Sequence, residues 1–114
     1  MLSIRFDEER EWWVSGRAFE RLFLSALEHG QLAPALEEWR HVADANGGFS
    51  LARLEPGVSR DLTVGLRAAA SAELARLGNV DEDSEDGTYK VSLEKLLAVT
   101  DVFQASATVV RNER

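Results

Sequence analysis

Hydrophobic and polar residues alternate at the start of the chain, and this period of two is typical of a half-buried β-strand. Leu2, Ile4 and Phe6 are the apolar residues of the first segment. A polar stretch follows, and the alternation returns with Trp12 and Val14. The two segments are therefore predicted to pair as an antiparallel hairpin.

The apolar spacing then changes to three and four residues, which is typical of amphipathic helices. Serine residues stand where three of these helices would begin, and a serine hydroxyl can accept a hydrogen bond from the free N–H groups of a first turn. The four predicted helices lie between Ser15 and Gly30, from Pro34 to Asn46, from Ser59 to Leu77, and from Ser92 onward. Short strands are further predicted near residues 49–54 and 88–91.

These elements predict an α+β fold dominated by helices, with about four helices and a small antiparallel sheet. The alternative is an all-α four-helix bundle with an extended N-terminal arm. The chain has 114 residues, a length typical of one hydrophobic core. We therefore predict a single compact domain over residues 1–114, with an acidic loop at residues 79–88.

The third predicted helix has two apolar faces. The residues of the larger face are Leu62, Leu66, Ala69, Ala70 and Leu77. The residues of the second face are small, namely Val64, Ala68, Ala72 and Ala75. A helix that is apolar on most sides is central in its fold or faces another chain. This pattern favours self-association, and we expect a homodimer.

Amino-acid composition excludes several kinds of site and argues against some kinds of partner. The chain contains 13 basic and 20 acidic residues, giving a net charge of −7, and no cysteine. Without cysteine there is no disulfide, no Cys-ligated zinc and no thiol nucleophile. The acidic balance argues against a nucleic-acid partner, which requires clustered Lys and Arg. The sequence shows neither signal-peptide features nor an apolar run of membrane-spanning length, so we expect a cytoplasmic protein with no membrane partner.

Most of the negative charge is local. Five of the seven net charges come from residues 81–86, where the acidic residues are Asp81, Glu82, Asp83, Glu85 and Asp86. Such a block is predicted to form a solvated loop, and a dense negative patch attracts basic partners. A basic protein partner, if one exists, is therefore expected at this loop.

The same loop suggests a calcium- or metal-responsive helix–loop–helix module as an alternative. If Gly87 takes the sixth position of an EF-hand loop, then Glu82, Ser84 and Asp86 fall on ligand positions. The twelfth position, however, is Leu93 where a bidentate glutamate is required. We therefore predict no metal ligands and no cofactor.

Histidine offers a second alternative, a small enzyme that uses His41 with nearby glutamates. Glu37 and Glu38 lie four and three residues before His41, so either could share its helix face. A surface ion pair or hydrogen bond explains this spacing more simply than general-base catalysis. His29 precedes the helix-stopping Gly30, where a cation favours the helix dipole.

Trp12 and Trp13 are adjacent, and adjacent residues of a strand point to opposite faces. One tryptophan can therefore lie in the core. The other either packs beneath a helix or loop, or is an exposed anchor for a partner or a second subunit, since tryptophan is enriched at interface hot spots.

The sequence contains no Gly-x-Ser-x-Gly elbow, phosphate loop or dinucleotide fingerprint. The favoured hypothesis is a small cytoplasmic protein-interaction domain without catalysis, with an inhibitor or immunity-type partner of a basic protein as one form. The residues predicted to bind a partner are Trp12, Trp13, Asp81, Asp83 and Asp86.

Overall fold

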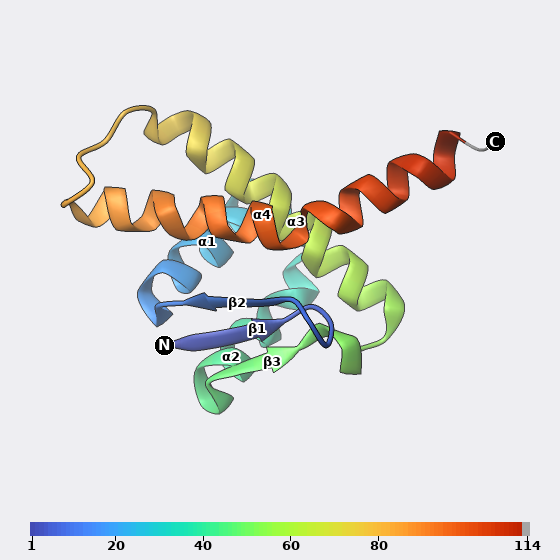
Figure 1. Ribbon diagram of the computed structural model, residues 1–114. Helices are drawn as coiled ribbons and strands as arrows, with labels where there is room; N and C mark the ends of the chain where they lie inside the picture. The colour runs from blue at the N-terminus through green and yellow to red at the C-terminus, as the bar shows by residue number, and fades with distance from the viewer. Residues whose placement is uncertain (113–114) are drawn as a thin grey trace.

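The computed structural model describes the backbone of residues 1–112 and the side chains of residues 1–101. Within this part of the chain, four α-helices accompany a three-stranded sheet, and the helix-dominated α+β prediction is confirmed (Figure 1). The elements are β1 (Leu2–Arg5), β2 (Glu11–Val14), α1 (Gly16–Glu28), the 3₁₀ helix η1 (Pro34–Glu37), α2 (Glu38–Asn46), β3 (Gly48–Ser50), the 3₁₀ helix η2 (Leu51–Arg53), α3 (Pro56–Leu77) and α4 (Glu85–Asn112).

The sheet has the strand order β2-β1-β3. β1 and β2 pair antiparallel as predicted, with Ile4 opposite Trp12. β3 pairs with β1 in parallel, with Ile4 opposite Phe49. The sheet is therefore mixed, and the wholly antiparallel prediction is wrong for β3. Alternating residues predict a strand but not its direction, which here is set by the crossover through α1 and α2.

A glycine makes the parallel pairing possible. Gly48 has φ +127°, and a Cβ atom there would lie 1.9 Å from the carbonyl oxygen of Ser3. The preceding Gly47 ends α2 with φ 72°, and its carbonyl oxygen accepts a hydrogen bond of 3.0 Å from the Ser3 N–H. The strand predicted at residues 49–54 is limited to three residues because the chain turns into η2 at Leu51.

Local capping explains where α1 and α2 begin and end. The Ser15 hydroxyl accepts the N–H of Ala18 at 3.1 Å, which confirms the predicted start of α1. His29 is the C-cap of α1, and its Nδ1 lies 2.9 Å from the carbonyl oxygen of Ser25. Pro34 opens η1, which leads into α2, because a proline has no N–H to lose in a first turn.

The long helices α3 and α4 begin earlier than predicted. α3 starts at Pro56 rather than near Ser59. α4 starts at Glu85 rather than near Ser92, so the strand predicted at residues 88–91 is wrong. Four residues of α4 spaced by four, three and four positions are buried, namely Tyr89, Leu93, Leu96 and Thr100, and this tertiary packing outweighs the β-propensity of the segment. The predicted acidic loop at 79–88 is consequently shorter, because its last four residues are helical.

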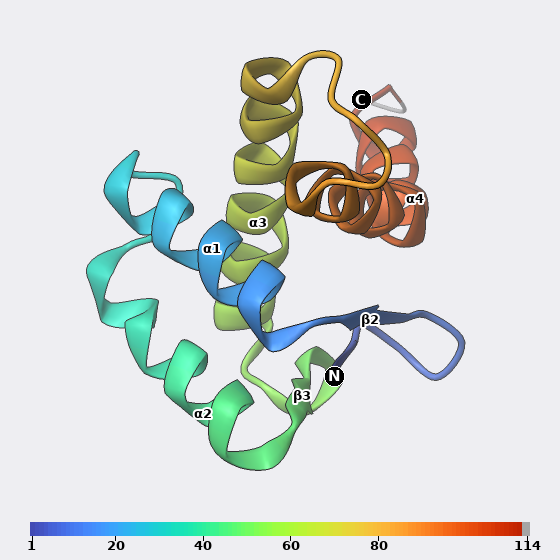
Figure 2. The ribbon, with the colours of Figure 1, turned by 90° about the vertical axis from the view of Figure 1, so that its left-hand side faces the viewer.

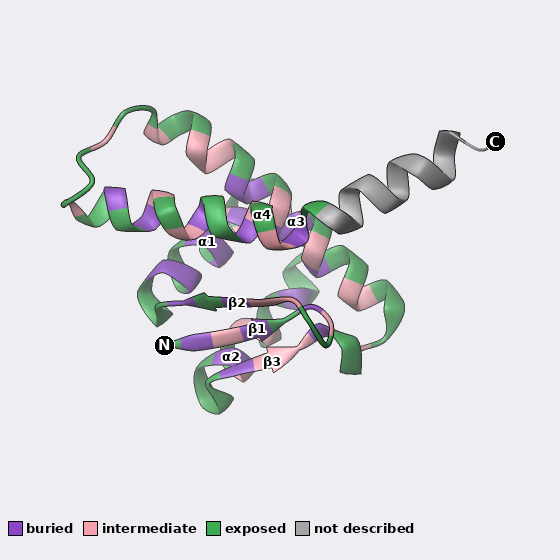
Figure 3. Ribbon diagram, viewed as in Figure 1, coloured by how far each residue is buried: buried purple, intermediate pink, exposed green. Residues whose placement is uncertain are grey.

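Helices cover one face of the sheet, and the core lies between them. The inward residues Leu2, Ile4, Trp12 and Val14 are all buried. Figure 2 shows α1 and α3 on the same side of the sheet, and Figure 3 marks buried residues in the strands and in α1, α3 and α4. α3 packs against both α1 and α4, so it is central in the fold, which is one of the two positions predicted for it. No helix of the described chain is long and apolar enough to cross a membrane.

Candidate functional site

The segment between α3 and α4 is built by hydrogen bonds from Asp81 and Ser84. The carbonyl oxygen of Asp81 accepts the Ser84 hydroxyl at 2.5 Å and the Ser84 N–H at 3.0 Å. The Asp81 carboxylate accepts the N–H of Asp83 at 3.0 Å. The Ser84 hydroxyl in turn accepts the N–H of Gly87 at 3.0 Å. This last contact caps the first turn of α4, because it satisfies an N–H group that has no partner within the helix.

Gly87 lets the loop fold closely over that first turn. A Cβ atom at Gly87 would lie 2.2 Å from the carbonyl oxygen of Asp81 and 2.8 Å from Cα of Glu82. Any side chain at this position would therefore displace the loop. We call residues 79–84 together with Glu94 the acidic site, because loop residues and Glu94 of α4 line one hollow.

Two of the five clustered carboxylates are used within the molecule. Glu85 forms an ion pair with Arg17 at 2.9 Å, and Asp86 forms one with Arg21 at 2.8 Å. Both arginines belong to α1, so these pairs connect the start of α4 to α1. Asp86, which was predicted to bind a partner, is therefore engaged by its own chain.

The remaining carboxylates are free of cations. Asp81, Glu82 and Asp83 are exposed, and none of them forms an ion pair with any residue that the structure describes. The sequence predicted Asp81 and Asp83 as binding residues and did not select Glu82. The free negative charge of the loop is thus concentrated in three consecutive residues.

Beside these carboxylates lies a hollow of about 340 Å³ between the loop and α4. Its walls are formed by Asn79, Val80, Glu82, Gly87, Lys90, Val91 and Glu94. Lys90 brings one positive charge to this lining, and its ammonium group donates to the carbonyl oxygen of Gly78 at 3.1 Å. Val91 is 44% exposed, so the hollow combines an apolar surface with two carboxylates, those of Glu82 and Glu94.

The buried Tyr89 contacts residues of two other helices. The Tyr89 hydroxyl donates to Oε1 of Glu73 at 3.0 Å, and the guanidinium of Arg21 lies 4.0 Å from the centre of the tyrosine ring. Arg76 pairs with Glu73 at 2.8 Å and donates to the Ser25 hydroxyl at 3.2 Å. α1, α3 and α4 therefore share one polar network that supports the base of the acidic site.

This network shifts the ionisation of both its acids. Burial, together with the neighbouring Glu73 carboxylate, raises the pKa of the Tyr89 hydroxyl well above its usual value. Burial alone would raise the pKa of Glu73, but hydrogen bonds from Arg76 and Tyr89 outweigh it and hold that pKa below its usual value. At neutral pH the pair is therefore a phenol donating to a carboxylate.

The two adjacent tryptophans have different environments. Trp12 is 1% exposed and belongs to the core. Trp13 is 55% exposed on the outer face of the sheet, and its Nε1 donates to Oε1 of Glu11 at 2.8 Å. Glu11 also accepts hydrogen bonds from Ser3 and Arg5, and these contacts, with the Ser3 bond the largest, lower its pKa. Of the two predicted anchors, only Trp13 is placed where a partner can contact it.

His41 is exposed on α2 and lines a shallow hollow of about 150 Å³ with Glu20, Arg40 and Asp44 among its neighbours. Among the residues that the structure describes, no hydrogen bond or ion pair joins His41 to Glu37 or Glu38, contrary to the prediction, and Glu37 pairs instead with Arg40 at 3.4 Å. The twelve-residue calcium loop of the EF-hand hypothesis is not formed, since residues from Glu85 onward are helical. Within the described part of the chain, no three His, Asp or Glu side chains are placed to hold a metal ion.

Sequence reasoning located the acidic loop but missed the residues that complete the site. Val91 was assigned to a strand because α4 was expected to begin seven residues later, and Glu94 was placed in the fourth helix but was not selected as a binding residue. Arg17 and Arg21 are spaced by one helical turn, which could have indicated that both reach the same acidic segment from α1.

Comparison of the chain with protein-family models, curated proteins and solved structures finds no match.

Proposed function

We propose that this protein is a small cytoplasmic protein-interaction domain that binds a basic segment of a partner protein at the acidic site. The observation that carries the proposal is the hollow beside the loop, which is lined by the exposed side chain of Val91 and by Glu82 and Glu94, two carboxylates that form no ion pair with any described residue. Asp83 adds a third free carboxylate at the tip of the loop.

This combination suits an arginine or lysine side chain. Both have an aliphatic stem that packs on apolar surface and a charged group that remains hydrated or pairs with carboxylates. The stem would lie on Val91, and the cation would reach Glu82 or Glu94. Arginine fits better than lysine, because its planar guanidinium donates to two acceptors at once.

Ion pairs within the chain determine which carboxylates remain available to a partner. Glu85 and Asp86 pair with Arg17 and Arg21, so the charges left for a partner are those of Asp81, Glu82, Asp83 and Glu94. A localised negative field accelerates encounter with a basic partner and discriminates against acidic ones. Covering a basic functional surface of the partner, as an inhibitor or immunity-type protein does, is one biological form of this function. Trp13 is the candidate for a second contact.

The test compares two triple variants with equal loss of charge. The first removes the carboxylates of the acidic site through Glu82→Gln, Asp83→Asn and Glu94→Gln. The matched control is Glu8→Gln, Glu28→Gln and Asp44→Asn, which neutralises three exposed acidic residues elsewhere that form no ion pair with the described residues. Each protein is immobilised and exposed to an extract of its native cells, and bound proteins are identified by mass spectrometry.

We expect the wild type and the control to retain the same basic protein, which moderate salt elutes, and the acidic-site variant to lose it. Calorimetry with that purified partner then measures the affinity difference, which we expect to be at least about tenfold for a loss of charge-assisted contacts. Equal retention by all three proteins would contradict the proposal. So would a wild type that retains no basic protein.

A further inference from the structure

The hollow at the acidic site is lined by charges of both signs. Lys90 is positively charged, and Glu82 and Glu94 are negatively charged. None of these three side chains forms an ion pair with a residue that the structure describes. A ligand with a cation alone would meet the Lys90 ammonium as well as the two carboxylates. The lining therefore favours a ligand that carries a cationic group and an anionic group together.

Lys90 is held in place and still has hydrogen-bond donors to offer. Its ammonium group donates one N–H to the carbonyl oxygen of Gly78, the residue at which α3 ends. An ammonium group has three N–H donors, so two remain for a ligand. Asn79 follows Gly78 in the chain and also lines the hollow, and its side-chain amide has two further N–H donors. Lys90 and Asn79 together suit a carboxylate.

The order of groups along α4 matches the order of groups in a residue with a long basic side chain. The backbones of Lys90 and Glu94 are about 6 Å apart along the helix axis, and the exposed Val91 lies between them in the sequence. In arginine and lysine, an aliphatic stem separates the side-chain cation from the backbone. A carboxylate at Lys90, a stem on Val91 and a cation at Glu94 would leave each charge of the ligand next to an opposite charge.

We propose that the acidic site binds the C-terminal residue of a partner protein whose chain ends in arginine or lysine. Only the last residue of a chain joins a free α-carboxylate to a basic side chain, and capture of a terminal carboxylate is a known mode of peptide recognition. The hollow of about 340 Å³ is at the small end of ligand pockets, which measure about 300–1,000 Å³, so it suits one residue. This inference rests on the proposed function and narrows the basic segment to its terminal residue.

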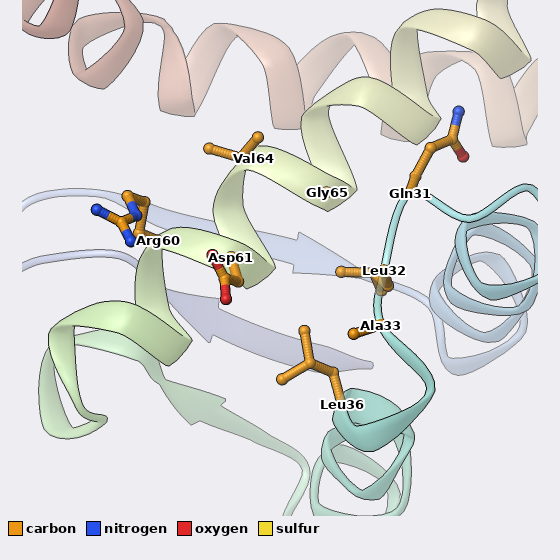
Figure 4. A pocket seen from close by; sticks show the side chains of 8 residues that line it. All are labelled: Gln31, Leu32, Ala33, Leu36, Arg60, Asp61, Val64 and Gly65. Carbon is orange, nitrogen blue, oxygen red and sulfur yellow. The ribbon is translucent and has the colours of Figure 1, made fainter.

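The hollow beside α3 provides a control (Figure 4). It is lined by Arg60 and Asp61, which are consecutive residues of α3, and otherwise by uncharged residues. Arg60 is exposed and, like Lys90, forms no ion pair with the residues that the structure describes. Substituting Arg60 with Gln therefore removes one positive charge from a different hollow, which makes it the matched control for Lys90→Gln.

The test titrates the isotopically labelled protein with two tripeptides and follows its backbone amide signals by NMR. One peptide is acetyl-Gly-Gly-Arg with a free C-terminal carboxylate, and the other is the same peptide with a C-terminal amide. The amidated peptide has the greater positive charge, so attraction to the acidic residues alone would favour it. We expect the peptide with the free carboxylate to bind about tenfold more tightly, as is typical when a hydrogen bond to a charged group is gained. The signals of residues 79–94 should shift.

Lys90→Gln should lose this preference for the free carboxylate, whereas Arg60→Gln should keep it. Circular dichroism establishes that each variant is folded. Free arginine is a third ligand, and its additional α-ammonium would lie beside Lys90, so it should bind more weakly than the tripeptide.

Three results would overturn the inference and leave the proposed function standing. They are equal or tighter binding of the amidated peptide by the wild type, retention of the preference by Lys90→Gln, and tighter binding of free arginine than of the tripeptide, which would assign the site to a small molecule. Failure of both tripeptides to bind would contradict the inference and the proposed function together.

Discussion

The indole N–H of Trp12 donates a hydrogen bond to the carbonyl oxygen of Ser92, with a nitrogen-to-oxygen distance of 3.0 Å. Trp12 belongs to β2, and Ser92 belongs to the second half of the chain in α4. The bond fixes the position of α4 over the edge of the sheet. It is therefore a direct link between the sheet and the helix that carries part of the acidic site.

Replacing Trp12 with Phe should destabilise the fold. The variant loses the hydrogen bond to Ser92 and leaves a small cavity, which together should lower the free energy of unfolding by about 2 kcal/mol. Urea denaturation followed by circular dichroism measures this change. Trp13→Phe is the control, and because Trp13 is half exposed its free energy of unfolding should change by less than about 0.5 kcal/mol. Equal costs for the two substitutions would contradict the assignment of Trp12 to the core.

Tyr89 should titrate above the ordinary tyrosine pKa. It is the only tyrosine in the chain, so the ultraviolet absorbance of tyrosinate reports on this residue alone. The folded protein should keep the phenol protonated at pH values where the unfolded chain, with a pKa near 10.0, has lost the proton. Stability is then fully present below that pH and falls as the pH rises above it.

Glu73→Gln provides the control for this titration. Removing the carboxylate takes away the secondary cause of the raised pKa and leaves burial in place, so the midpoint should move down but stay above that of free tyrosine. A wild-type midpoint equal to that of free tyrosine would show that Tyr89 is not buried against Glu73 in solution.

Low pH should also weaken the network of Tyr89 and Glu73, because it protonates the Glu73 carboxylate. The pKa of Glu73 is lowered in the folded protein, so its contribution to stability is present above the pKa of an unfolded glutamate and is lost as the pH falls through the folded value. Denaturant unfolding of the wild type and of Glu73→Gln over the acidic range measures this. The difference in stability between them should shrink toward low pH, and a constant difference would contradict the prediction.

Two glycine substitutions should have opposite effects. Gly87→Ala introduces a methyl group against the carbonyl oxygen of Asp81, so we expect it to lower stability by about 1–3 kcal/mol and to displace the acidic loop. Gly57→Ala lies in the first turn of α3 with open space around it, so it should raise stability by about 0.5 kcal/mol. Thermal unfolding distinguishes the two outcomes, and a neutral Gly87→Ala would contradict the close packing of the loop.

The two arginines of α1 should contribute unequally. Arg21 pairs with Asp86 and also stacks on Tyr89, so Arg21→Gln should cost about 1 kcal/mol. Arg17 makes a more exposed ion pair with Glu85, so Arg17→Gln should cost less than about 0.5 kcal/mol. Urea unfolding at low and high salt measures both, and the Arg17 effect should disappear at high salt.

The sequence predicted those elements whose ends are determined locally. The hairpin, α1 and α2 depend on alternation, on the Ser15 cap and on Gly47, all of which act within a few residues. The parallel direction of β3 and the early start of α4 depend on distant packing. β-branched residues around Tyr89 favoured a strand, but burial of Tyr89 against α1 and α3 made the segment helical.

The acidic site was predictable in location but not in composition. A dense run of carboxylates is visible in any reading of the sequence. Which of them are free depends on Arg17 and Arg21, which lie far away in the chain and reach Glu85 and Asp86 only after α1 and α4 have packed. The sequence therefore predicted Asp86 as a binding residue and omitted Glu82 and Glu94.

The parallel pairing of β3 has a consequence for biosynthesis. β1 is translated first among the strands but occupies the middle of the sheet, and its second neighbour is translated only after α1 and α2. Until β3 and α3 leave the ribosome, the buried side chains of the hairpin, Trp12 among them, have no complete partner surface. A nascent chain halted before Gly48 should therefore bind chaperones that recognise exposed apolar segments, and release from them should coincide with the emergence of α3.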